Sequence, residues 1–309
     1  MKTLITGCAG FVGSHLTERL LKNGSEVIGI DCFSDYYDRE LKEKNLAVSL
    51  KNDKFTFIEK DILEMDEYPD VDYVYHIAAQ AGVRDSWGDN FKGYTSNNIE
   101  VTWKLLEFYK ELNIKKFVYS SSSSVYGDAE LPMNEKSRLR PVSPYGVTKL
   151  AAENLCYLYW KNYKIPTISL RFFTVYGPRQ RPDMAINKFF SSILTGNEIV
   201  VYGDGEQKRD FTFVDDAVNA ILTAAESRVV GDVFNVGGGS TISVNRLINE
   251  IEEITGKKAR VTYIEKQKGD VENTEANLEK IETVLRWKPT ISIRTGLKKY
   301  MGWYTNNFC

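Results

Sequence analysis

The stretch TLITGCAGFVGSHL, residues 3–16, places three glycines between a strand-like run and a helical pattern. A turn that leads from a strand directly into a helix needs glycine where the backbone becomes left-handed and where it passes close to a ligand. The helix that follows offers free N–H groups and the positive end of its dipole, which favour phosphate groups. The sequence therefore predicts a pyrophosphate site formed by Gly7, Gly10, Phe11, Val12 and Gly13.

Short apolar runs alternate with helical patterns in the first half of the chain, which is typical of a series of β-α-β units. The predicted strands cover residues 2–6, 26–31, 55–59, 72–77, 116–120 and 166–171, and the predicted helices cover 11–22, 97–111 and 144–163. This order predicts an α/β fold of the Rossmann type, a doubly wound parallel sheet with helices on both faces.

The second predicted strand, EVIGID, ends in Asp31, 18 residues after Gly13. A carboxylate at this place accepts hydrogen bonds from the hydroxyls of an adenosine ribose, and it repels the 2′-phosphate of NADP. Cys32 and Phe33 follow, so no adjacent arginine is present to bind that phosphate. The pattern favours NAD as the cofactor.

After about residue 165 the pattern becomes looser, with the glycine-rich stretches GDGEQKRD and VGGGS and with helices expected near 185–195, 241–255 and 292–305. We expect residues 1–165 to form the NAD-binding domain. Residues 166–309 are expected to form mainly a smaller, mixed α/β substrate lobe, with some segments that return to the first domain.

The stretch SPYGVTKLAAE, residues 143–153, predicts a helix that Ser143 caps and that begins at Pro144. Tyr145 and Lys149 then lie on one face, near the positive end of this helix. A phenol with an ordinary pKa near 10 needs a shift of roughly three units, about 4 kcal/mol, to act as a base at pH 7. A nearby ammonium group and the helix terminus favour such a shift, whereas the alternative is an ordinary solvated helix face.

The composition excludes several other classes of protein. The formal net charge is −2 without a basic block, so no electrostatic signature of nucleic-acid or membrane-surface binding is present. The four cysteines lie far apart and His15 and His76 are the only histidines, which argues against a metal site or a disulfide framework. The chain begins with a strand-like run and has no long apolar segment, so we expect a cytoplasmic protein without a bound metal.

The tract SSSSSVYGD, residues 120–128, follows the fifth predicted strand. A serine run is typical of a flexible linker, but ligands bind at the carboxyl ends of the strands of a parallel sheet. Ser122 also precedes Tyr145 by 23 residues. We interpret the tract as part of a site.

The motifs GxxGxxG, Asp31, AAQAGV, SSSSSVYG, YxxxK, RFFTVYGPRQRPDM and RDFTFVDD occur here in this order. Together they closely resemble the extended short-chain dehydrogenase/reductase family, and within it the UDP-sugar 4-epimerases. The resemblance implies that Tyr145 is the catalytic base for the sugar 4-hydroxyl while a hydride passes to NAD. It also implies that Lys149 binds the nicotinamide ribose and lowers the pKa of the tyrosine, and that Ser122 hydrogen-bonds the same sugar oxygen. Further cofactor contacts are implied for Asp61, Ile62, Ala78, Ala79, Gln80 and Asn98.

The resemblance also implies a substrate site in the second lobe, where Arg209 binds the diphosphate and Asp270 the uridine ribose. Thr174 stands where many members have asparagine, and Gln267 stands where UDP-glucose epimerases have a second arginine, so UDP-glucose is the less favoured substrate. The implied substrate-binding residues are Arg84, Ser122, Ser123, Ser124, Thr174, Arg181, Arg209, Asp270 and Thr274.

Enzymes of this kind first oxidise C4 of the sugar to a ketone and differ in the acid and base groups that act next. Dehydratases carry an Asp-Glu pair, and decarboxylating relatives a glutamate, where this chain has Ser123 and Ser124. Serine supplies no carboxylic acid or base, so the predicted reaction is 4-epimerisation with NAD regenerated. A dehydratase, a net dehydrogenase and a non-catalytic sensor of NAD or a nucleotide sugar are the alternatives.

Three substrates stay open. The stretch RFFTVYGPRQRPDM resembles UDP-glucuronate 4-epimerases most closely, with Arg181 and Thr174 as partners for the carboxylate. Thr274 replaces a bulky tyrosine and leaves room for an N-acetyl group, so UDP-N-acetylglucosamine is also open, with UDP-glucose third. The resemblance further implies a homodimer through the helices near 95–112 and 144–163, and a role in cell-surface polysaccharide biosynthesis.

Overall fold

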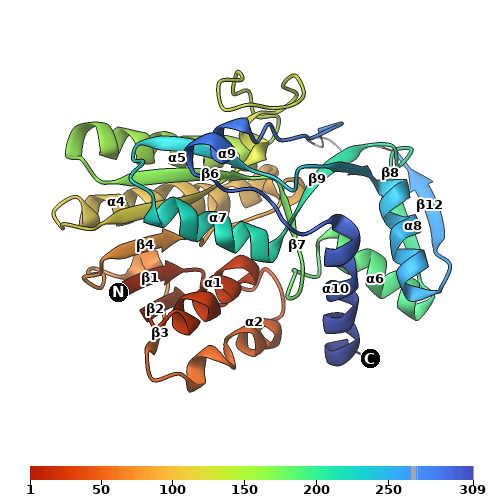
Figure 1. Cartoon of the computed structure of the whole chain (residues 1–309), viewed down its shortest axis with the longest axis horizontal. Helices are drawn as coiled ribbons and strands as arrows, with labels where there is room; N and C mark the ends of the chain where they lie inside the picture. Colours follow the sequence, from red (N-terminus) through yellow and green to blue (C-terminus); the bar gives the residue numbers. More distant parts are fainter. Residues whose placement is uncertain (266–268, 270, 309) are drawn as a thin grey trace.

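Seven parallel strands form the main sheet of the protein, in the order β10-β6-β5-β4-β1-β2-β3 (Figure 1). The computed structural model describes residues 1–265, 269 and 271–308. The predicted Rossmann-type, doubly wound fold is confirmed, because every neighbouring pair in this sheet is parallel. The strands are β1 (Lys2–Thr6), β2 (Glu26–Asp31), β3 (Phe55–Glu59), β4 (Tyr73–His76), β5 (Lys116–Ser122), β6 (Thr167–Phe172) and β10 (Asp232–Val236).

The strand order reverses between β1 and β4. From β1 the chain builds outward through β2 and β3 on one side, and then through β4, β5 and β6 on the other. The connections that leave β1 and β4 therefore diverge at the carboxyl edge of the sheet and open a crevice there. Gly7 and Ala78 follow these two strands closely and lie at this crevice.

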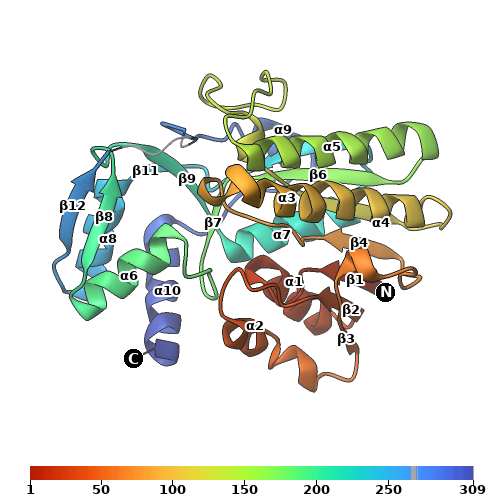
Figure 2. The ribbon, with the colours of Figure 1, turned by 180° about the vertical axis from the view of Figure 1, so that it is seen from behind.

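Helices cover both faces of the main sheet (Figures 1 and 2). α1 (Phe11–Lys22), α2 (Arg39–Leu46) and α7 (Val214–Glu226) lie on one face, and α4 (Val101–Tyr109) and α5 (Pro144–Tyr163) on the other. Successive residues of β1 point to opposite faces, so that Ile5 belongs to the core beneath α1 and α7 and Leu4 to the core beneath α4 and α5. Burial on both faces is the reason why these strands read as nearly continuous apolar runs.

The second lobe lies beside one end of the main sheet (Figures 1 and 2). A three-stranded sheet contains β7 (Thr174–Tyr176), β9 (Lys208–Phe213) and β11 (Thr241–Ser243), and β8 (Glu198–Tyr202) pairs in parallel with β12 (Arg260–Ile264). The helices of this part are α6 (Ala185–Thr195), α8 (Val244–Thr255) and α10 (Ile293–Phe308), whereas α9 (Glu279–Val284) packs against β10 of the main sheet. β6, α7 and β10 come after residue 165 but belong to the layers of the main sheet, so the chain crosses between the lobes more than once.

Two predicted helices have different bounds in the structure. The segment 97–111 begins in a π-helical stretch, Thr95–Glu100, which α3 (Phe91–Tyr94) precedes. The second helix, predicted near 241–255, begins only at Val244, because Ser243 caps α8 by accepting a hydrogen bond from the backbone N–H of Arg246. Residues 241–243 form β11 instead. The short 3₁₀ helices are Ser49–Lys51, Ile62–Glu64, Arg84–Ser86, Gly88–Asn90 and Ser123–Val125.

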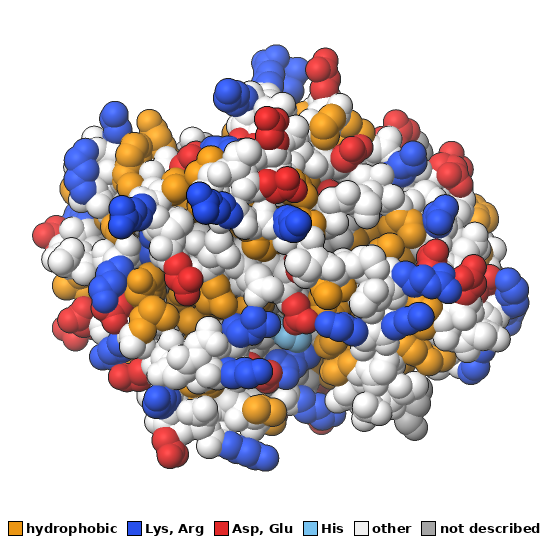
Figure 3. Space-filling model, in the orientation of Figure 1, with side chains coloured by type: hydrophobic (Ala, Val, Ile, Leu, Met, Phe, Trp, Pro, Cys, Tyr) orange, Lys and Arg blue, Asp and Glu red, His pale blue; other side chains and the backbone are white. Residues whose placement is uncertain are grey.

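Acidic and basic side chains are interspersed on the face of the molecule that Figure 3 shows. None of the helices in the described ranges combines the length and the apolar character that a membrane span requires.

A buried ion pair joins α5 to the main sheet. Arg171 of β6 donates to both carboxylate oxygens of Glu153, at 2.5 Å and 3.0 Å, and Ser121 of β5 donates to the same carboxylate at 2.6 Å. The side chains of Arg171 and Glu153 are only 3% and 10% exposed. Each charge therefore depends on the other, because water does not replace a lost partner at this depth.

We expect Glu153→Gln to lower the free energy of unfolding by about 3–5 kcal/mol, because it leaves the Arg171 charge buried without a counter-charge. Urea denaturation measures the change. The double variant Glu153→Leu with Arg171→Met is expected to lose much less, because it removes both charges. Glu43→Gln is the control, since Glu43 pairs with Arg39 in solvent, and it is expected to leave the midpoint unchanged. Equal losses in the single and double variants would contradict the interpretation.

Candidate active site

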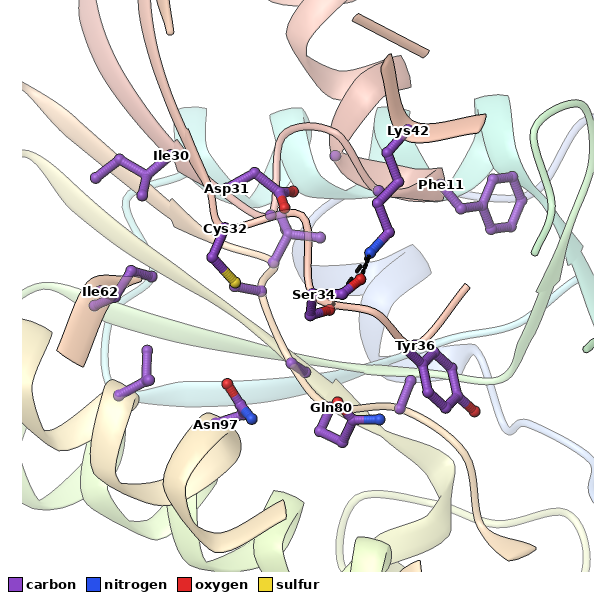
Figure 4. Close-up of a pocket in the computed structure, with 18 of the residues that line it drawn as sticks. Phe11, Ile30, Asp31, Cys32, Ser34, Tyr36, Lys42, Ile62, Gln80 and Asn97 are labelled. Carbon is purple, nitrogen blue, oxygen red and sulfur yellow. Dashed lines mark hydrogen bonds between the residues drawn. The ribbon is translucent and has the colours of Figure 1, made fainter. Parts of the chain in front are cut away.

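The glycine turn lies at the crevice of the main sheet and forms one wall of a cavity (Figure 4). Gly7 has a φ of 71°, a conformation that favours glycine. A Cβ at Gly13 would lie 2.0 Å from the carbonyl oxygen of Gly7, so only glycine lets α1 begin this close to β1. All five residues predicted to hold the pyrophosphate line the cavity: Gly7, Gly10, Phe11, Val12 and Gly13.

Asp31 ends β2 and borders the same cavity. Its carboxylate accepts hydrogen bonds from the backbone N–H groups of Ala9, at 3.0 Å, and Phe33, at 2.9 Å. Burial raises the pKa of Asp31, while these two N–H groups act in the opposite direction. The carboxylate is thus held at the mouth of the glycine turn, where a nucleotide ribose fits, and the cavity offers NAD both a phosphate cradle and a ribose acceptor.

The other predicted cofactor residues mostly line this cavity as well: Asp61, Ile62, Ala78, Ala79 and Gln80. Asp61 is fixed by a hydrogen bond that its side chain accepts from the N–H of Leu63 at 2.8 Å. The sequence reasoning missed several residues that line the cavity: Ser34, Tyr36, Tyr37, Lys42, Lys60, Asn97 and Val101. Figure 4 labels four of them, Ser34, Tyr36, Lys42 and Asn97. Most of the missed residues come from the loop and helix after β2, where the sequence shows no recognisable motif.

Asn98 lies behind the cavity wall, and Asn97 lines the cavity in its place. The Asn98 side chain is buried and is hydrogen-bonded to both backbone groups of Gln80, accepting from its N–H at 2.8 Å and donating to its carbonyl at 3.0 Å. It also donates to Thr148 of α5 at 2.9 Å. The side chain of Asn98 therefore holds the loop after β4 against α5, and it supports the cavity wall through Gln80.

Tyr145 lies in the first turn of α5, which Ser143 caps by accepting from the N–H of Gly146 at 3.1 Å. Burial raises the pKa of Tyr145, and a hydrogen bond with Ser122 and the charge of Arg181 oppose this rise. The structure thus brings Ser122 and Tyr145 together, as predicted. Because burial outweighs the opposing groups, the phenol keeps its proton in the protein alone.

Lys149 follows one turn after Tyr145, and its Nζ lies 4.6 Å from the centre of the Tyr119 ring. Burial lowers the pKa of Lys149 to about 7, although Cys156 and Glu153 act against the shift. The sequence analysis expected Lys149 to lower the pKa of Tyr145. In this structure the cation that does so is Arg181, which the sequence does not place near the tyrosine.

A small polar pocket lies beside the end of β5. Ser123, Ser124 and Thr174 line it together with Arg209 and Thr274. Thr274 is buried, and its hydroxyl oxygen lies 3.4 Å from the N–H of Asp210, from which it accepts. Five of the residues predicted to bind the substrate thus come from separate strands and loops to one pocket. The predicted residues Asp270 and Gln267 lie outside the described residues.

A second, larger pocket continues from the first, and Thr174 and Arg209 border both. Arg84 also lines it, with its guanidinium 4.1 Å from the centre of the Tyr202 ring. Arg209 donates to the backbone carbonyls of Val271, at 2.7 Å, and Glu272, at 2.9 Å. The larger pocket therefore has two arginines in its lining.

The two arginines of GPRQRPDM have different environments. Arg181 lines the cofactor cavity, forms two hydrogen bonds of 2.9 Å with Asp183, and has its guanidinium 5.5 Å from the centre of the Tyr36 ring. Arg179 turns away and pairs with Glu18 of α1 at 2.6 Å. Of the two, Arg181 is the one within electrostatic reach of Tyr145.

Comparison with known proteins agrees with this geometry. The model of the NAD dependent epimerase/dehydratase family matches residues 3–237. The chain is 40% identical over 313 residues to a UDP-glucuronate 4-epimerase of Thermodesulfobacterium geofontis, with 98% of this chain and 96% of the relative covered. It is 43% identical over 302 residues to an uncharacterised UDP-glucose epimerase of Bacillus subtilis, with 96% of each covered. The crystal structure of the UDP-glucuronic acid 4-epimerase from Bacillus cereus with UDP-glucuronic acid and NAD has a TM-score of 0.96 and 42% identity, and both chains are covered completely.

The lowered pKa of Lys149 predicts how stability depends on pH. The unfolded chain keeps this proton up to its ordinary pKa of 10.5, whereas the folded protein releases it at about 7. The free-energy cost of burying the charged ammonium group is fully present below about pH 7. It is relieved as the pH rises from about 7 toward 10.5. We expect the free energy of unfolding of the NAD-free protein, measured in urea, to rise more steeply between about pH 7 and 9 in the wild type than in Lys149→Met. Lys44→Met, on an exposed part of α2, is expected to keep the wild-type slope; parallel profiles for Lys149→Met would refute the prediction.

Proposed function

We infer that the chain, which belongs to the NAD dependent epimerase/dehydratase family, is an NAD-dependent 4-epimerase of UDP-sugars, and we propose UDP-glucuronate as its substrate. The observation that carries this proposal is the hydrogen bond of Ser122 with Tyr145, which the charge of Arg181 reaches, next to a pocket that Ser123, Ser124 and Thr174 line. Hydroxyl groups and a guanidinium are suitable partners for the carboxylate of a uronate.

The chemistry follows from the placement of the side chains. When bound, NAD accepts a hydride from C4 of the sugar and later returns it. Tyr145 acts as the base once the positive charge of bound nicotinamide lowers its pKa: it removes the proton of the 4-hydroxyl group and gives it back after the ketone has turned its other face to the cofactor. Ser122 hydrogen-bonds the same oxygen, and Lys149, one turn further along α5, adds positive charge in its protonated form.

Rotation of the 4-keto sugar requires that the nucleotide be held more firmly than the sugar. Arg84 and Arg209 line the larger pocket, and the smaller pocket adds the hydroxyl groups of Ser123, Ser124 and Thr174. Charged contacts are stronger than neutral ones, so the diphosphate, with two arginines, is held more firmly than the sugar, for which Arg181 is the proposed charged partner.

The side chains after β5 argue against a dehydratase. Ser123 and Ser124 line the sugar pocket, where elimination or decarboxylation would need a carboxylic acid or base. Return of the hydride is the simplest fate of the ketone at such a site. A sensor of NAD or nucleotide sugars would need the glycine turn and Asp31, but not Ser122, Tyr145 and Lys149 together.

UDP-N-acetylglucosamine is the second candidate substrate. Thr274 is small and lines the sugar pocket, which leaves room for an N-acetyl group. UDP-glucose is third, because it would leave Arg181 without a substrate carboxylate.

We expect Arg181→Ala to raise the KM for UDP-glucuronate by roughly tenfold to a hundredfold, because it removes a charged hydrogen bond to the carboxylate. The KM for UDP-glucose is expected to change little, while kcat falls for every sugar because the charge of Arg181 also lowers the pKa of Tyr145. NMR of the product at C4 measures turnover of all three sugars, with Tyr145→Phe as the control in which kcat falls roughly 10²–10⁴-fold. No reaction of the wild type with UDP-glucuronate, or an unchanged KM in Arg181→Ala, would contradict the proposal that Arg181 binds the carboxylate of UDP-glucuronate. NADH formed in proportion to the substrate would instead indicate a dehydrogenase.

We also propose a homodimer through α4 and α5. These two helices pack against each other and carry large apolar side chains on their outer surface, of which Trp103 is 46%, Tyr157 51% and Leu158 50% exposed. Apolar side chains gathered on adjacent helices are typical of a protein–protein interface.

NAD and nucleotide sugars are metabolites of the cytoplasm, so we propose that the protein acts in this compartment. The product, an activated glycosyl donor, is suited to cell-surface polysaccharide biosynthesis.

Leu158→Asp is expected to weaken the dimer at least about a hundredfold, because it buries a charge in an apolar contact. Sedimentation velocity at several concentrations measures the change. Leu50→Asp is the matched control, since Leu50 is 56% exposed but lies away from α4 and α5. A monomeric wild type, or a Leu158→Asp variant that stays dimeric, would contradict the proposal.

A further inference from the structure

Two polar contacts join α1 to the loop 177–184, which carries Arg181. His15 Nε2 lies 2.9 Å from the carbonyl oxygen of Pro178, to which the neutral ring donates in its Nε2–H tautomer. One turn further along α1, Glu18 accepts from Arg179 at 2.6 Å. Burial, together with the charge of Arg179, lowers the pKa of His15, so the ring is neutral at pH 7. We call these four residues the brace.

The ion pair of the brace is partly buried. The side chains of Arg179 and Glu18 are 17% and 31% exposed. Within the described residues, Nη1 of Arg179 is buried without a hydrogen-bond partner, so this guanidinium depends on Glu18 for its compensation. Removal of the Glu18 charge would leave Arg179 uncompensated at a partly buried place.

The backbone of the loop requires such support. Arg179 has a φ of 66° and Gly177 a φ of 143°. A non-glycine residue avoids the left-handed region because its Cβ crowds the neighbouring carbonyl group, and it stays there only when its surroundings hold it. The brace holds Pro178 and Arg179 on the side of α1, and the chain then turns so that Arg181 points into the cofactor cavity.

Helix α1 contacts both sites. Its first residues, Phe11 and Val12, line the cofactor cavity, and its next two turns carry His15 and Glu18 (Figures 1 and 2 show the loop between β7 and α6 beside α1). A rigid helix that touches the cofactor at one end and the loop further along transmits a shift between them.

We propose that the brace positions Arg181, so that cofactor binding at α1 and recognition of the substrate carboxylate by Arg181 strengthen each other. The inference rests on the proposed function, because it takes the substrate to be a UDP-uronate. Glu18 and Arg179 are positioning residues that act through Arg181. By linkage, NAD raises the affinity for the uronate by the same factor by which the uronate raises the affinity for NAD.

Two variants test the brace in the NAD-loaded protein. Glu18→Gln removes one charge, and Glu18→Arg combined with Arg179→Glu reverses the pair. We expect Glu18→Gln to weaken binding of UDP-glucuronate about tenfold in calorimetry and binding of UDP-glucose less than about twofold, and the reversed pair to recover most of the loss. Arg19→Gln is the matched control on the same helix, because Arg19 binds Asn219 of α7 at 2.8 Å.

Hydrogen exchange of residues 177–184 gives a second readout that does not depend on the sugar. NAD is expected to slow exchange there in the wild type and in Arg19→Gln, and to slow it far less in Glu18→Gln. Equal weakening of both UDP-sugars in Glu18→Gln, or NAD-dependent protection equal to that of the wild type, would overturn the brace.

The two proposals fail in different ways. If the wild type does not prefer the uronate and Arg181→Ala has no effect, the proposed substrate is wrong, and the exchange measurement alone decides whether the brace links NAD to the loop. If Arg181→Ala removes the preference and Glu18→Gln does not alter it, the substrate stands and the brace is wrong.

Discussion

The close contact between Gly13 and the carbonyl group of Gly7 is the constraint on which the rest of the site depends. A side chain at Gly13 would collide with that oxygen at 2.0 Å, so glycine alone lets α1 begin immediately beyond β1. This contact brings the positive end of α1 to the edge of the sheet, beside Asp31. It also sets the position of the two turns of α1 from which His15 and Glu18 reach the loop of Arg181.

Burial controls the protonation of the two proposed catalytic side chains of α5. Tyr145 and Lys149 lie on one face of α5, and the loss of water raises the pKa of the phenol and lowers that of the ammonium group. Glu153 continues the same face and is bound to Arg171 and Ser121. The buried ion pair therefore anchors the helix that presents the base, while the charge of Arg181 reaches Tyr145 from the opposite lobe.

Motifs predicted the cofactor side of the site better than the substrate side. The glycine turn and Asp31 are local features, so their positions follow from one turn and one strand end. Asn98 was predicted as a cofactor contact, but a π-helical turn directs it to Gln80 and Thr148 and leaves Asn97 at the cavity. No periodicity in the sequence distinguishes these two adjacent asparagines, because the widened turn depends on packing against α5.

The sequence by itself determined the α/β fold and the preference for NAD, because each depends on spacing within one or two neighbouring elements, and the resemblance to the family implied the pairing of Ser122 with Tyr145. The resemblance to UDP-glucuronate 4-epimerases singled out Arg181 of the two arginines in GPRQRPDM, but only the tertiary structure showed the partners of each. Arg179 and Arg181 are equivalent by composition and differ by two positions. Arg181 pairs with Asp183 of its own loop, whereas Arg179 pairs with Glu18, which is 161 residues away. Packing of a distant segment, rather than local pattern, holds Arg179 against α1 and leaves Arg181 at the cofactor cavity.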